Sequence, residues 1–157
     1  MTTAFVFPGQ GSQSVGMGKE LAETFPAAKE VFDAVDEALE QRLSAIMFEG
    51  PEEELTLTEN AQPAIMAVSL AIMAVLNDQG GVSLANKASH AAGHSVGEFS
   101  AYTAAETFSL TDTARLLKVR GKAMQNAVPI GAGAMAVLIG VEPDVAAIIV
   151  AEAALDE

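Results

Sequence analysis

Gly93-His94-Ser95-Val96-Gly97 contains one serine between two glycines, and it is the most informative part of the sequence for the fold. Residues 87–93 before it have a weak strand pattern, and a helical pattern follows it to about residue 105. A serine at such a strand-to-helix turn is typical of a nucleophile elbow, where small neighbours let backbone segments pack closely. The backbone N–H of Val96 and the helix N-terminus then face a developing oxyanion. The stretch therefore predicts Ser95 as a nucleophile; alternatively, Ser95 caps the helix at a glycine-rich turn.

Strand and helix patterns alternate along the rest of the chain. The apolar run Ala4-Phe5-Val6-Phe7, closed by Pro8-Gly9, predicts a buried strand running into a loop. Alternation of this kind is typical of an α/β protein with parallel strands, and the last strand–helix pair predicts the opening of a second unit. Helices are predicted from Lys19, from Pro26, from about Pro63 to Leu76 with Thr58 or Asn60 as cap, from the elbow to about Ala105, from the cap Thr111 to about Ala127 and from Asp144 to Ala154. A short segment, Leu43 to Phe48, ends at Gly50-Pro51, and a further strand is predicted from Ala134 to Ile139.

Composition and charge exclude several classes of protein. Of the 157 residues 50% are hydrophobic, and the mean hydropathy is +0.31, which excludes a wholly disordered chain. The 8 basic and 21 acidic residues give a formal net charge of −13. A charge of this sign repels nucleic acid and anionic lipid. There is no cysteine, so disulfides, cysteine-based zinc sites and a thiol nucleophile are excluded.

The sequence shows no sign of export, of membrane insertion or of a cofactor site. Its start, Met1-Thr2-Thr3-Ala4, has neither the basic nor the apolar region of a signal peptide. The longest near-apolar run, Ala64 to Leu76, is too short to span a bilayer and predicts a buried core helix. Residues 131–136 match G-x-G-x-x-A but precede their strand, so a dinucleotide site is not expected. We expect a cytoplasmic protein with no membrane, nucleic-acid or metal partner and no bound cofactor.

A serine nucleophile needs a base, usually a histidine. The chain contains two histidines, His90 and His94, and neither follows Ser95. His94 is adjacent to the serine on a sharp turn, where neighbouring side chains diverge, and His90 on the predicted strand is best interpreted as a core histidine. A complete esterase triad within these residues is therefore not expected. The base is a lysine or a carboxylate, or it lies on polypeptide that this chain lacks.

Arg120 is the second unusual residue. Helical spacing puts it on a stripe with Leu116, Met124 and Ala127, whereas the other three basic residues of that helix share another face. An unpaired guanidinium on a buried face is costly, and its planar fork fits a carboxylate bound through two hydrogen bonds. The position predicts either a carboxylate ligand or a structural ion pair with a core carboxylate.

Four motifs resemble, in the same order, those of malonyl-CoA:acyl carrier protein transacylases and of the acyltransferase domains of fatty-acid and polyketide synthases. The resemblance covers the whole chain but about the first half of the family's length. The arginine of the fourth motif follows the serine of the third by 25 residues. The motifs are Phe5-Val6-Phe7-Pro8-Gly9-Gln10-Gly11-Ser12-Gln13, Gln62-Pro63-Ala64, Gly93-His94-Ser95-Val96-Gly97-Glu98 and Arg120-Gly121-Lys122-Ala123-Met124-Gln125.

The resemblance implies a fold and a set of site residues. The fold is an α/β-hydrolase-like large subdomain with parallel strands that carries the nucleophile, residues 1–130, and the beginning of a ferredoxin-like small subdomain, residues 131–157. The implied roles are Ser95 as nucleophile, the backbone N–H groups of Gln10 and Val96 as the oxyanion hole, Arg120 as the residue that grips the malonyl carboxylate, and His94 and Gln62 as further substrate-binding residues.

The resemblance also implies an activity. Malonyl-CoA passes its malonyl group, through an ester on Ser95, to the phosphopantetheine thiol of acyl carrier protein in fatty-acid biosynthesis. The substrates carry the CoA and the phosphopantetheine. The family's catalytic histidine lies downstream, so the C-terminal half of the same enzyme is an expected partner. Two alternatives stay open: a serine hydrolase or thioesterase, which has no reason to place Arg120 on an apolar face, and an inactive fragment that needs the other half.

Overall fold

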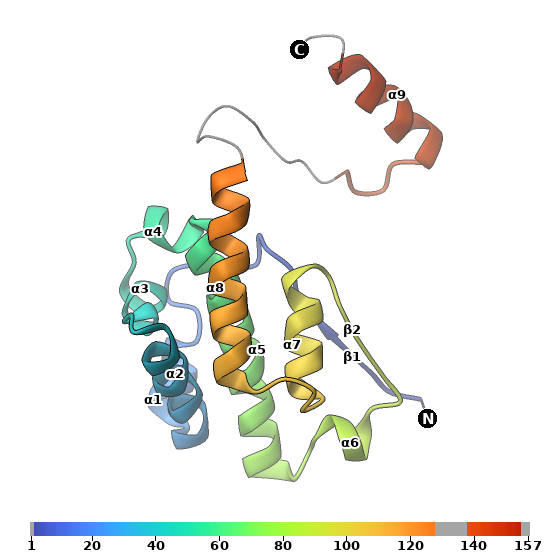
Figure 1. Ribbon diagram of the computed structural model, residues 1–157. Helices are drawn as coiled ribbons and strands as arrows, with labels where there is room; N and C mark the ends of the chain where they lie inside the picture. Colours follow the sequence, from blue (N-terminus) through green and yellow to red (C-terminus); the bar gives the residue numbers. More distant parts are fainter. Residues whose placement is uncertain (1, 128–137, 155–157) are drawn as a thin grey trace. The chain divides into compact units, whose positions relative to one another are not determined.

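The computed structural model describes residues 2–127 and 138–154 and divides the chain into two units, residues 1–127 and 128–157. The predicted boundary, between residues 130 and 131, lies outside the described residues and stays a prediction. The first unit comprises helices beside a small sheet (Figure 1). Its elements are β1 (Ala4–Phe7), α1 (Lys19–Thr24), α2 (Pro26–Leu39), α3 (Leu43–Glu49), α4 (Glu52–Thr56), α5 (Thr58–Gly80), α6 (Leu84–Lys87), β2 (His90–Gly93), α7 (Val96–Ala104) and α8 (Leu110–Ala127).

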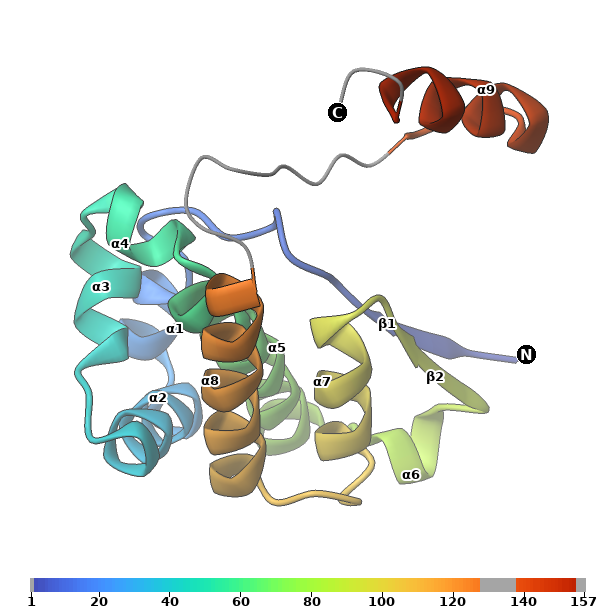
Figure 2. The ribbon, with the colours of Figure 1, turned by 45° about the horizontal axis from the view of Figure 1, so that its top comes forward.

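The two strands form a parallel pair, as the alternation of patterns predicts. Ala4 pairs with His90 at one end and Phe7 with Gly93 at the other. Parallel strands need a crossover connection, and the chain between β1 and β2 forms α1 to α6. The sheet lies beside α7 and away from α2 in both ribbon views (Figure 2). This arrangement brings the end of β1 next to the end of β2, where the serine turn begins.

Helices cover one face of this sheet among the described residues. Phe7 is buried together with Leu84 and Ala101, whereas the adjacent Val6 is 76% exposed. Successive side chains of a strand point to opposite faces, so the second face is open. The prediction of a buried first strand is therefore wrong for the described chain, in which Phe7 is the buried residue of β1. The interpretation of His90 as a core histidine is wrong as well, because this residue is exposed.

α5 is the central helix of the first unit. α2 and α8 both pack against it, and α2 begins at Pro26, as predicted, because proline fits the first position of a helix. Apolar residues three or four apart give α2 one inward face. The buried side chains of the main core are Ala28, Phe32, Val35, Ala38, Leu43, Met47, Leu55, Ala64, Ile65, Met66, Ala67, Ala71, Val96, Ala114 and Leu117.

α5 begins earlier than predicted. It starts at Thr58, so Pro63 lies inside the helix rather than at its beginning. The predicted caps, Thr58 and Asn60, are themselves helical. The side chain of Asn60 instead donates a hydrogen bond to the Glu54 carbonyl, at 2.8 Å, and so links α5 to α4. The helix also ends later than the predicted Leu76, at Gly80, with Gly81 in the left-handed conformation.

Two further local features differ from the predictions. Ser109, rather than Thr111, caps α8, because the Ser109 hydroxyl accepts a hydrogen bond from the backbone N–H of Asp112 at 3.0 Å. α6 was not predicted, and its short length explains why periodicity misses it. Ser83 and Asn86 form a capping box at its start, in which each side chain bonds to the backbone of the other.

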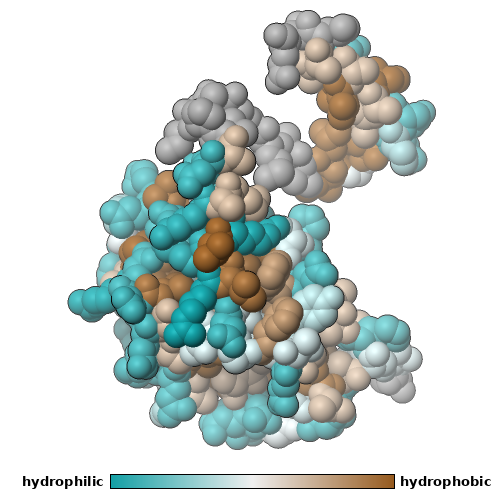
Figure 3. All heavy atoms as spheres, viewed as in Figure 1, coloured by the Kyte–Doolittle hydropathy of each residue, from teal (hydrophilic) through white to brown (hydrophobic). Residues whose placement is uncertain are grey.

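α5 is also the one described helix that is long and apolar enough to cross a membrane by length and composition. The protein buries 56% of its apolar window. A mostly buried helix of this kind is the core helix of a folded unit, which agrees with the prediction for residues 64–76. The apolar surface that remains over the first unit is interspersed with hydrophilic side chains (Figure 3).

The second unit contains α9 (Pro143–Ala153) among its described residues. This helix agrees with the prediction for residues 144–154, and Pro143 occupies its first turn. The strand predicted from residue 134 to residue 139 lies mostly outside the described residues. Whether this unit begins a ferredoxin-like subdomain stays a prediction.

Candidate active site

Ser95 stands at a strained turn between the end of β2 and the start of α7. Its backbone has φ 54° and ψ −110°, a conformation that is uncommon and costly for a residue with a Cβ. The side chain is exposed and makes no capping hydrogen bond to the helix. The predicted elbow geometry is therefore present, and the alternative of a simple helix cap is not. That Ser95 acts as a nucleophile stays a prediction.

The two glycines that flank this serine are required by close backbone contacts. A Cβ atom added to Gly93 would lie 1.9 Å from the carbonyl carbon of Gly97. A Cβ atom added to Gly97 would lie 2.3 Å from the carbonyl oxygen of Phe7, at the end of β1. Both contacts are with backbone atoms that cannot rotate away. The glycines thus allow the start of α7 to pack directly against the ends of both strands, and this packing holds Ser95 at the edge of the sheet.

Arg120 connects three of the four motifs, because its side chain contacts both Ser95 and Gln62. Its Nη2 donates a hydrogen bond to Ser95 Oγ at 3.0 Å, and its Nη1 donates one to Gln62 Oε1 at 2.7 Å. The guanidinium carbon also lies 5.7 Å from the centre of the Phe99 ring, within range of a cation–π interaction. Three of the predicted site residues therefore meet in one place.

No carboxylate forms an ion pair with Arg120 within the described ranges. The structural ion pair that was the alternative for this residue is thus not observed there. The partners of the guanidinium are a hydroxyl, an amide oxygen and a ring. They leave its full positive charge available to an incoming anion, next to the proposed nucleophile.

The predicted surroundings of Arg120 are wrong. Its stripe was expected to face the core, but Leu116 is 46% exposed and Val119, beside Arg120, is 66% exposed. The buried face of α8 consists of small or slender side chains that allow close packing on α5 and α2. These residues are Thr113, Ala114, Leu117 and Gly121.

Lys118 also differs from the prediction, which placed it with Arg115 and Lys122 on the face away from the apolar stripe of α8. Its side chain is 17% exposed. Its Nζ donates hydrogen bonds of 2.8 Å to Gln41 Oε1 and Asn60 Oδ1, and it lies 3.5 Å from a carboxylate oxygen of Glu59. Helical angles alone miss such a residue, because its partners belong to α5 and to the segment that follows α2.

The predicted oxyanion donors belong to two segments, the start of α7 and the loop after β1. Val96 is buried and is the first residue of α7, where backbone N–H groups have no acceptor within the helix. Gln10 lies in the loop after β1, and its side-chain Nε2 donates to Thr58 Oγ1 at 3.3 Å. The Ser12 hydroxyl bonds the Gly9 carbonyl at 2.9 Å and holds this loop. The oxyanion-hole assignment stays a prediction.

His94 and Gln62, the other two predicted binding residues, differ in their surroundings. His94 is exposed, and its backbone carbonyl accepts a hydrogen bond from Gly97 N at 2.9 Å, so its main chain helps to close the elbow. Gln62 is fully buried. Its Nε2 points to Met124 Sδ at 3.2 Å while its Oε1 accepts from Arg120. Gln62 therefore fixes one arm of the guanidinium.

Sequence reasoning missed Phe99 and Met124 as members of this site. Phe99 follows Ser95 by four residues and Met124 follows Arg120 by four, which is one helical turn in each case. That spacing is the signal that would have found both. Neither side chain carries a charged or nucleophilic group, so its residue type alone does not indicate a catalytic role.

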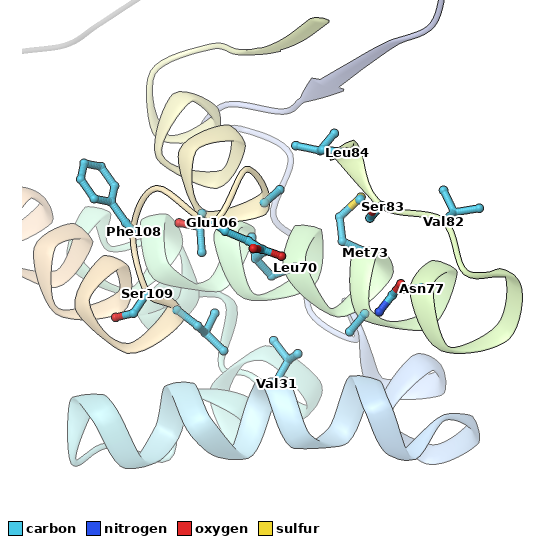
Figure 4. A pocket seen from close by; sticks show the side chains of 14 residues that line it. Val31, Leu70, Met73, Asn77, Val82, Ser83, Leu84, Glu106, Phe108 and Ser109 are labelled. Carbon is cyan, nitrogen blue, oxygen red and sulfur yellow. The ribbon is translucent and has the colours of Figure 1, made fainter. Parts of the chain in front are cut away.

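A pocket of about 520 Å³ elsewhere in the first unit is not the candidate site. It lies between α2, α5 and the segment that joins α7 to α8, as Figure 4 shows. Its lining includes Val31, Met73 and Phe108 but none of the site residues described above. No group of three or more metal-ligating side chains occurs in the part of the chain that the structure describes.

The fold and this site define a class of protein: an α/β protein with a serine at a strained strand-to-helix turn and an arginine hydrogen-bonded to that serine. The chain belongs to the acyl transferase domain family, because the sequence model of that family matches residues 4–153. The resemblance stated from the motifs is thereby confirmed. The described residues form a mixed α/β unit, mostly helical, with two parallel strands. That this unit is part of an α/β-hydrolase-like subdomain stays a prediction.

Relatives in this family include transacylases. The malonyl CoA-acyl carrier protein transacylase of Bacillus subtilis strain 168 is 49% identical over 141 residues, which are 90% of this chain and 43% of that protein. The acyl-carrier-protein-S-malonyltransferase of Bartonella henselae is 59% identical in sequence. Its crystal structure matches with a TM-score of 0.89 over 97% of this chain and 49% of its own. The chain thus spans about half the length of these relatives.

A third relative was solved with a partner. It is a malonyl-transacylase in complex with a type II PKS acyl-carrier protein, 43% identical to this chain, with a TM-score of 0.76. The match covers 82% of this chain and 40% of that one.

Proposed function

We propose that this chain supplies the nucleophile and the carboxylate clamp of a malonyl-CoA:acyl carrier protein transacylase in fatty-acid synthesis. The observation that carries the proposal is the position of Arg120, 3.0 Å from Ser95 Oγ. Malonyl-CoA has a thioester carbonyl and a free carboxylate separated by one methylene group. A serine that attacks the carbonyl therefore needs a cation for the carboxylate only a few ångströms away.

The proposed reaction has two steps. Ser95 Oγ attacks the thioester carbonyl carbon and loses its proton to a base, and collapse of the tetrahedral intermediate breaks the C–S bond. CoA leaves as a thiol after it takes up the proton, and the malonyl group stays as an ester on Ser95. The phosphopantetheine thiol of acyl carrier protein then attacks this ester, which forms the new thioester and restores the hydroxyl. No bound cofactor takes part.

Different residues around Ser95 stabilise the two negative charges of the reacting malonyl group, the oxyanion and the carboxylate. The N–H groups of Val96 and Gln10 are the proposed donors to the oxyanion that forms at the carbonyl oxygen, where fixed donors stabilise the transition state. Arg120 holds the carboxylate, and Gln62 keeps its Nη1 in place at 2.7 Å. The Nη2 bond to Ser95 is exchanged for a bond to the substrate, which leaves the hydroxyl free to attack. His94 completes the proposed substrate contacts.

The proposed activity needs two partners in addition to this chain. The catalytic base is the histidine that the family carries downstream, so the second half of the enzyme is the first partner. Acyl carrier protein is the second, and the complex of the related malonyl-transacylase supports this choice. The first unit belongs to an α/β-hydrolase-like subdomain, and the second begins the ferredoxin-like one. The enzyme acts in the cytoplasm.

The test of this function is the preference for malonyl over acetyl. The assay uses a full-length enzyme in which this chain is joined to the remaining part of the Bartonella henselae relative, the part to which this chain has no counterpart. Arg120→Ala is expected to lower kcat/KM for malonyl-CoA by about ten- to a hundredfold, because a hydrogen bond to a charged group contributes about 1.5–3 kcal/mol. Acetyl-CoA has no carboxylate, so its slow reaction falls little or improves. Arg120→Lys restores the preference in part, since an ammonium lacks the two-pronged contact.

Lys122→Ala is the matched control. It removes a positive charge from the same helix at an exposed position and is expected to leave the malonyl-to-acetyl ratio unchanged. Circular dichroism verifies that each variant is folded. An unchanged ratio in folded Arg120→Ala contradicts the carboxylate clamp and favours a serine hydrolase, whose hydrolysis of both thioesters is then measured directly.

A further inference from the structure

The first turns of α5 connect the two halves of the candidate site. On one side, Gln10 of the loop after β1 donates to Thr58 Oγ1 at 3.3 Å. On the other, Arg120 of α8 donates to Gln62 Oε1 at 2.7 Å. The loop proposed to bind the oxyanion and the residue proposed to bind the carboxylate therefore rest on the same five residues, 58–62. The distance between the loop that contains Gln10 and the guanidinium of Arg120 therefore depends on how α8 packs on residues 58–62.

Gly121 sets how closely α8 approaches α5. A Cβ atom at this position would lie 2.5 Å from Glu59 Cα and 2.6 Å from the carbonyl oxygen of Thr58. Both are backbone atoms inside a helix, so neither can swing aside as the end of a long side chain can. Any side chain at position 121 must push the two helices apart. Glycine is a poor helix former, so its place inside α8 needs a reason of this kind.

Lys118 ties the same two helices together one turn earlier. Its ammonium reaches Asn60 at 2.8 Å and Glu59 at 3.5 Å, and it also bonds Gln41 near the end of α2. Asn60 is itself buried. α8 is thus fixed on the start of α5 by a polar anchor at residue 118 and by a backbone contact at residue 121. Arg120 lies between these two points.

We propose that Gly121, together with Lys118, is a positioning residue that holds Arg120 at the distance from Ser95 that a malonyl group requires. This inference rests on the proposed function and adds the origin of its specificity. Gly121 touches neither substrate nor Ser95, and it acts through Arg120. A displacement of about 1 Å at a binding residue is enough to cost up to about a hundredfold in rate. The preference for an acyl group with a free carboxylate therefore depends on a glycine outside the site.

The test replaces Gly121 with alanine in the full-length enzyme. We expect the malonyl-to-acetyl ratio of kcat/KM to fall by about ten- to a hundredfold, with acetyl transfer nearly unchanged. Gly80→Ala is the matched control. Gly80 is also helical, in the last turn of α5, but an added Cβ meets only Val82 Cγ2 at an ordinary 3.6 Å. This variant is expected to keep the wild-type ratio.

A double variant separates positioning from general loss of structure. If Gly121 acts through Arg120, then Gly121→Ala has no further effect on the ratio in the Arg120→Ala background. A merely structural role lowers transfer from both donors equally in either background, and that result overturns the inference. Should Gly121→Ala fail to fold, Lys118→Met keeps the volume and removes the anchor. It is expected to lower the ratio at least about threefold, on the same reasoning, and an unchanged ratio in folded Lys118→Met also overturns the inference.

The outcomes distinguish this inference from the function on which it rests. A wild-type enzyme with no malonyl preference, or an Arg120→Ala variant that keeps it, contradicts the proposed function. An Arg120→Ala variant that loses the preference while Gly121→Ala retains it contradicts the positioning role alone.

Discussion

Replacing Ser95 with alanine in the full-length enzyme is expected to lower malonyl transfer by about 10⁴-fold or more, because loss of the nucleophile in serine enzymes removes the covalent route. The same change removes the malonyl ester. Wild-type enzyme mixed with malonyl-CoA, without acyl carrier protein, accumulates one malonyl group on Ser95, and the variant accumulates none. Intact mass spectrometry measures the adduct, and peptide mapping locates it.

Ser89 offers a matched control for this experiment. It is an exposed serine just before β2, and the contact that fixes it is the bond from its backbone N–H to the Thr3 carbonyl at 2.8 Å. Ser89→Ala is therefore expected to form the ester at the wild-type yield. An adduct of equal yield in the Ser95→Ala protein would show that another residue is the nucleophile, and the strained turn would then need another explanation.

The elbow could be predicted from sequence because its determinants are local. Gly93, Ser95 and Gly97 lie within five residues, and the strand and helix that flank them have their own periodic patterns. The backbone conformation of Ser95, with φ 54°, follows from these neighbours. The parallel pairing of the strands was predictable for a similar reason, since a chain that alternates between strand and helix leaves few other topologies.

The surroundings of Arg120 could not be predicted, because they depend on how three helices cross. Hydropathy places Leu116 on the inner face of α8, yet it is exposed. The inner face carries Leu117 and, about one turn further on, Gly121 against the backbone of α5. A pattern of apolar residues records which side chains avoid water. It does not record where two backbones come so close that no side chain fits. The contacts of Arg120 with Gln62 and Phe99 come from that crossing.

Residues 1–157, isolated from any further polypeptide, are expected to transfer malonyl at least about 10⁴-fold more slowly than the full-length enzyme. The reason lies at Ser95. Within residues 2–127 and 138–154, the side chain that hydrogen-bonds its Oγ is Arg120, a donor that cannot accept a proton. Neither histidine follows the serine in the chain, and loss of the base in a serine triad costs several orders of magnitude, about 10⁶-fold in one well-studied case.

The open face of the sheet predicts a second defect of the isolated chain, namely aggregation. Val6 is 76% exposed on the face of the sheet that no described helix covers, and exposed apolar strands associate with other chains. We therefore expect the isolated chain to aggregate more readily than the full-length enzyme. Addition of the unmatched part of the Bartonella henselae relative in trans is expected to restore both solubility and transfer, if the two parts assemble.

The measurement is malonyl transfer to acyl carrier protein by material whose intact mass is that of residues 1–157, with its Ser95→Ala variant as the background. The rate after addition of the second polypeptide serves as the reference. Full turnover by the isolated chain, abolished by Ser95→Ala, would mean that the base lies within these residues. The nearest candidates in sequence would then be His94 and Glu98, and the proposal of a downstream histidine would be wrong. A rate at the background level, restored in trans, is the outcome expected when Ser95 and Arg120 lie on one half of the enzyme and the base on the other.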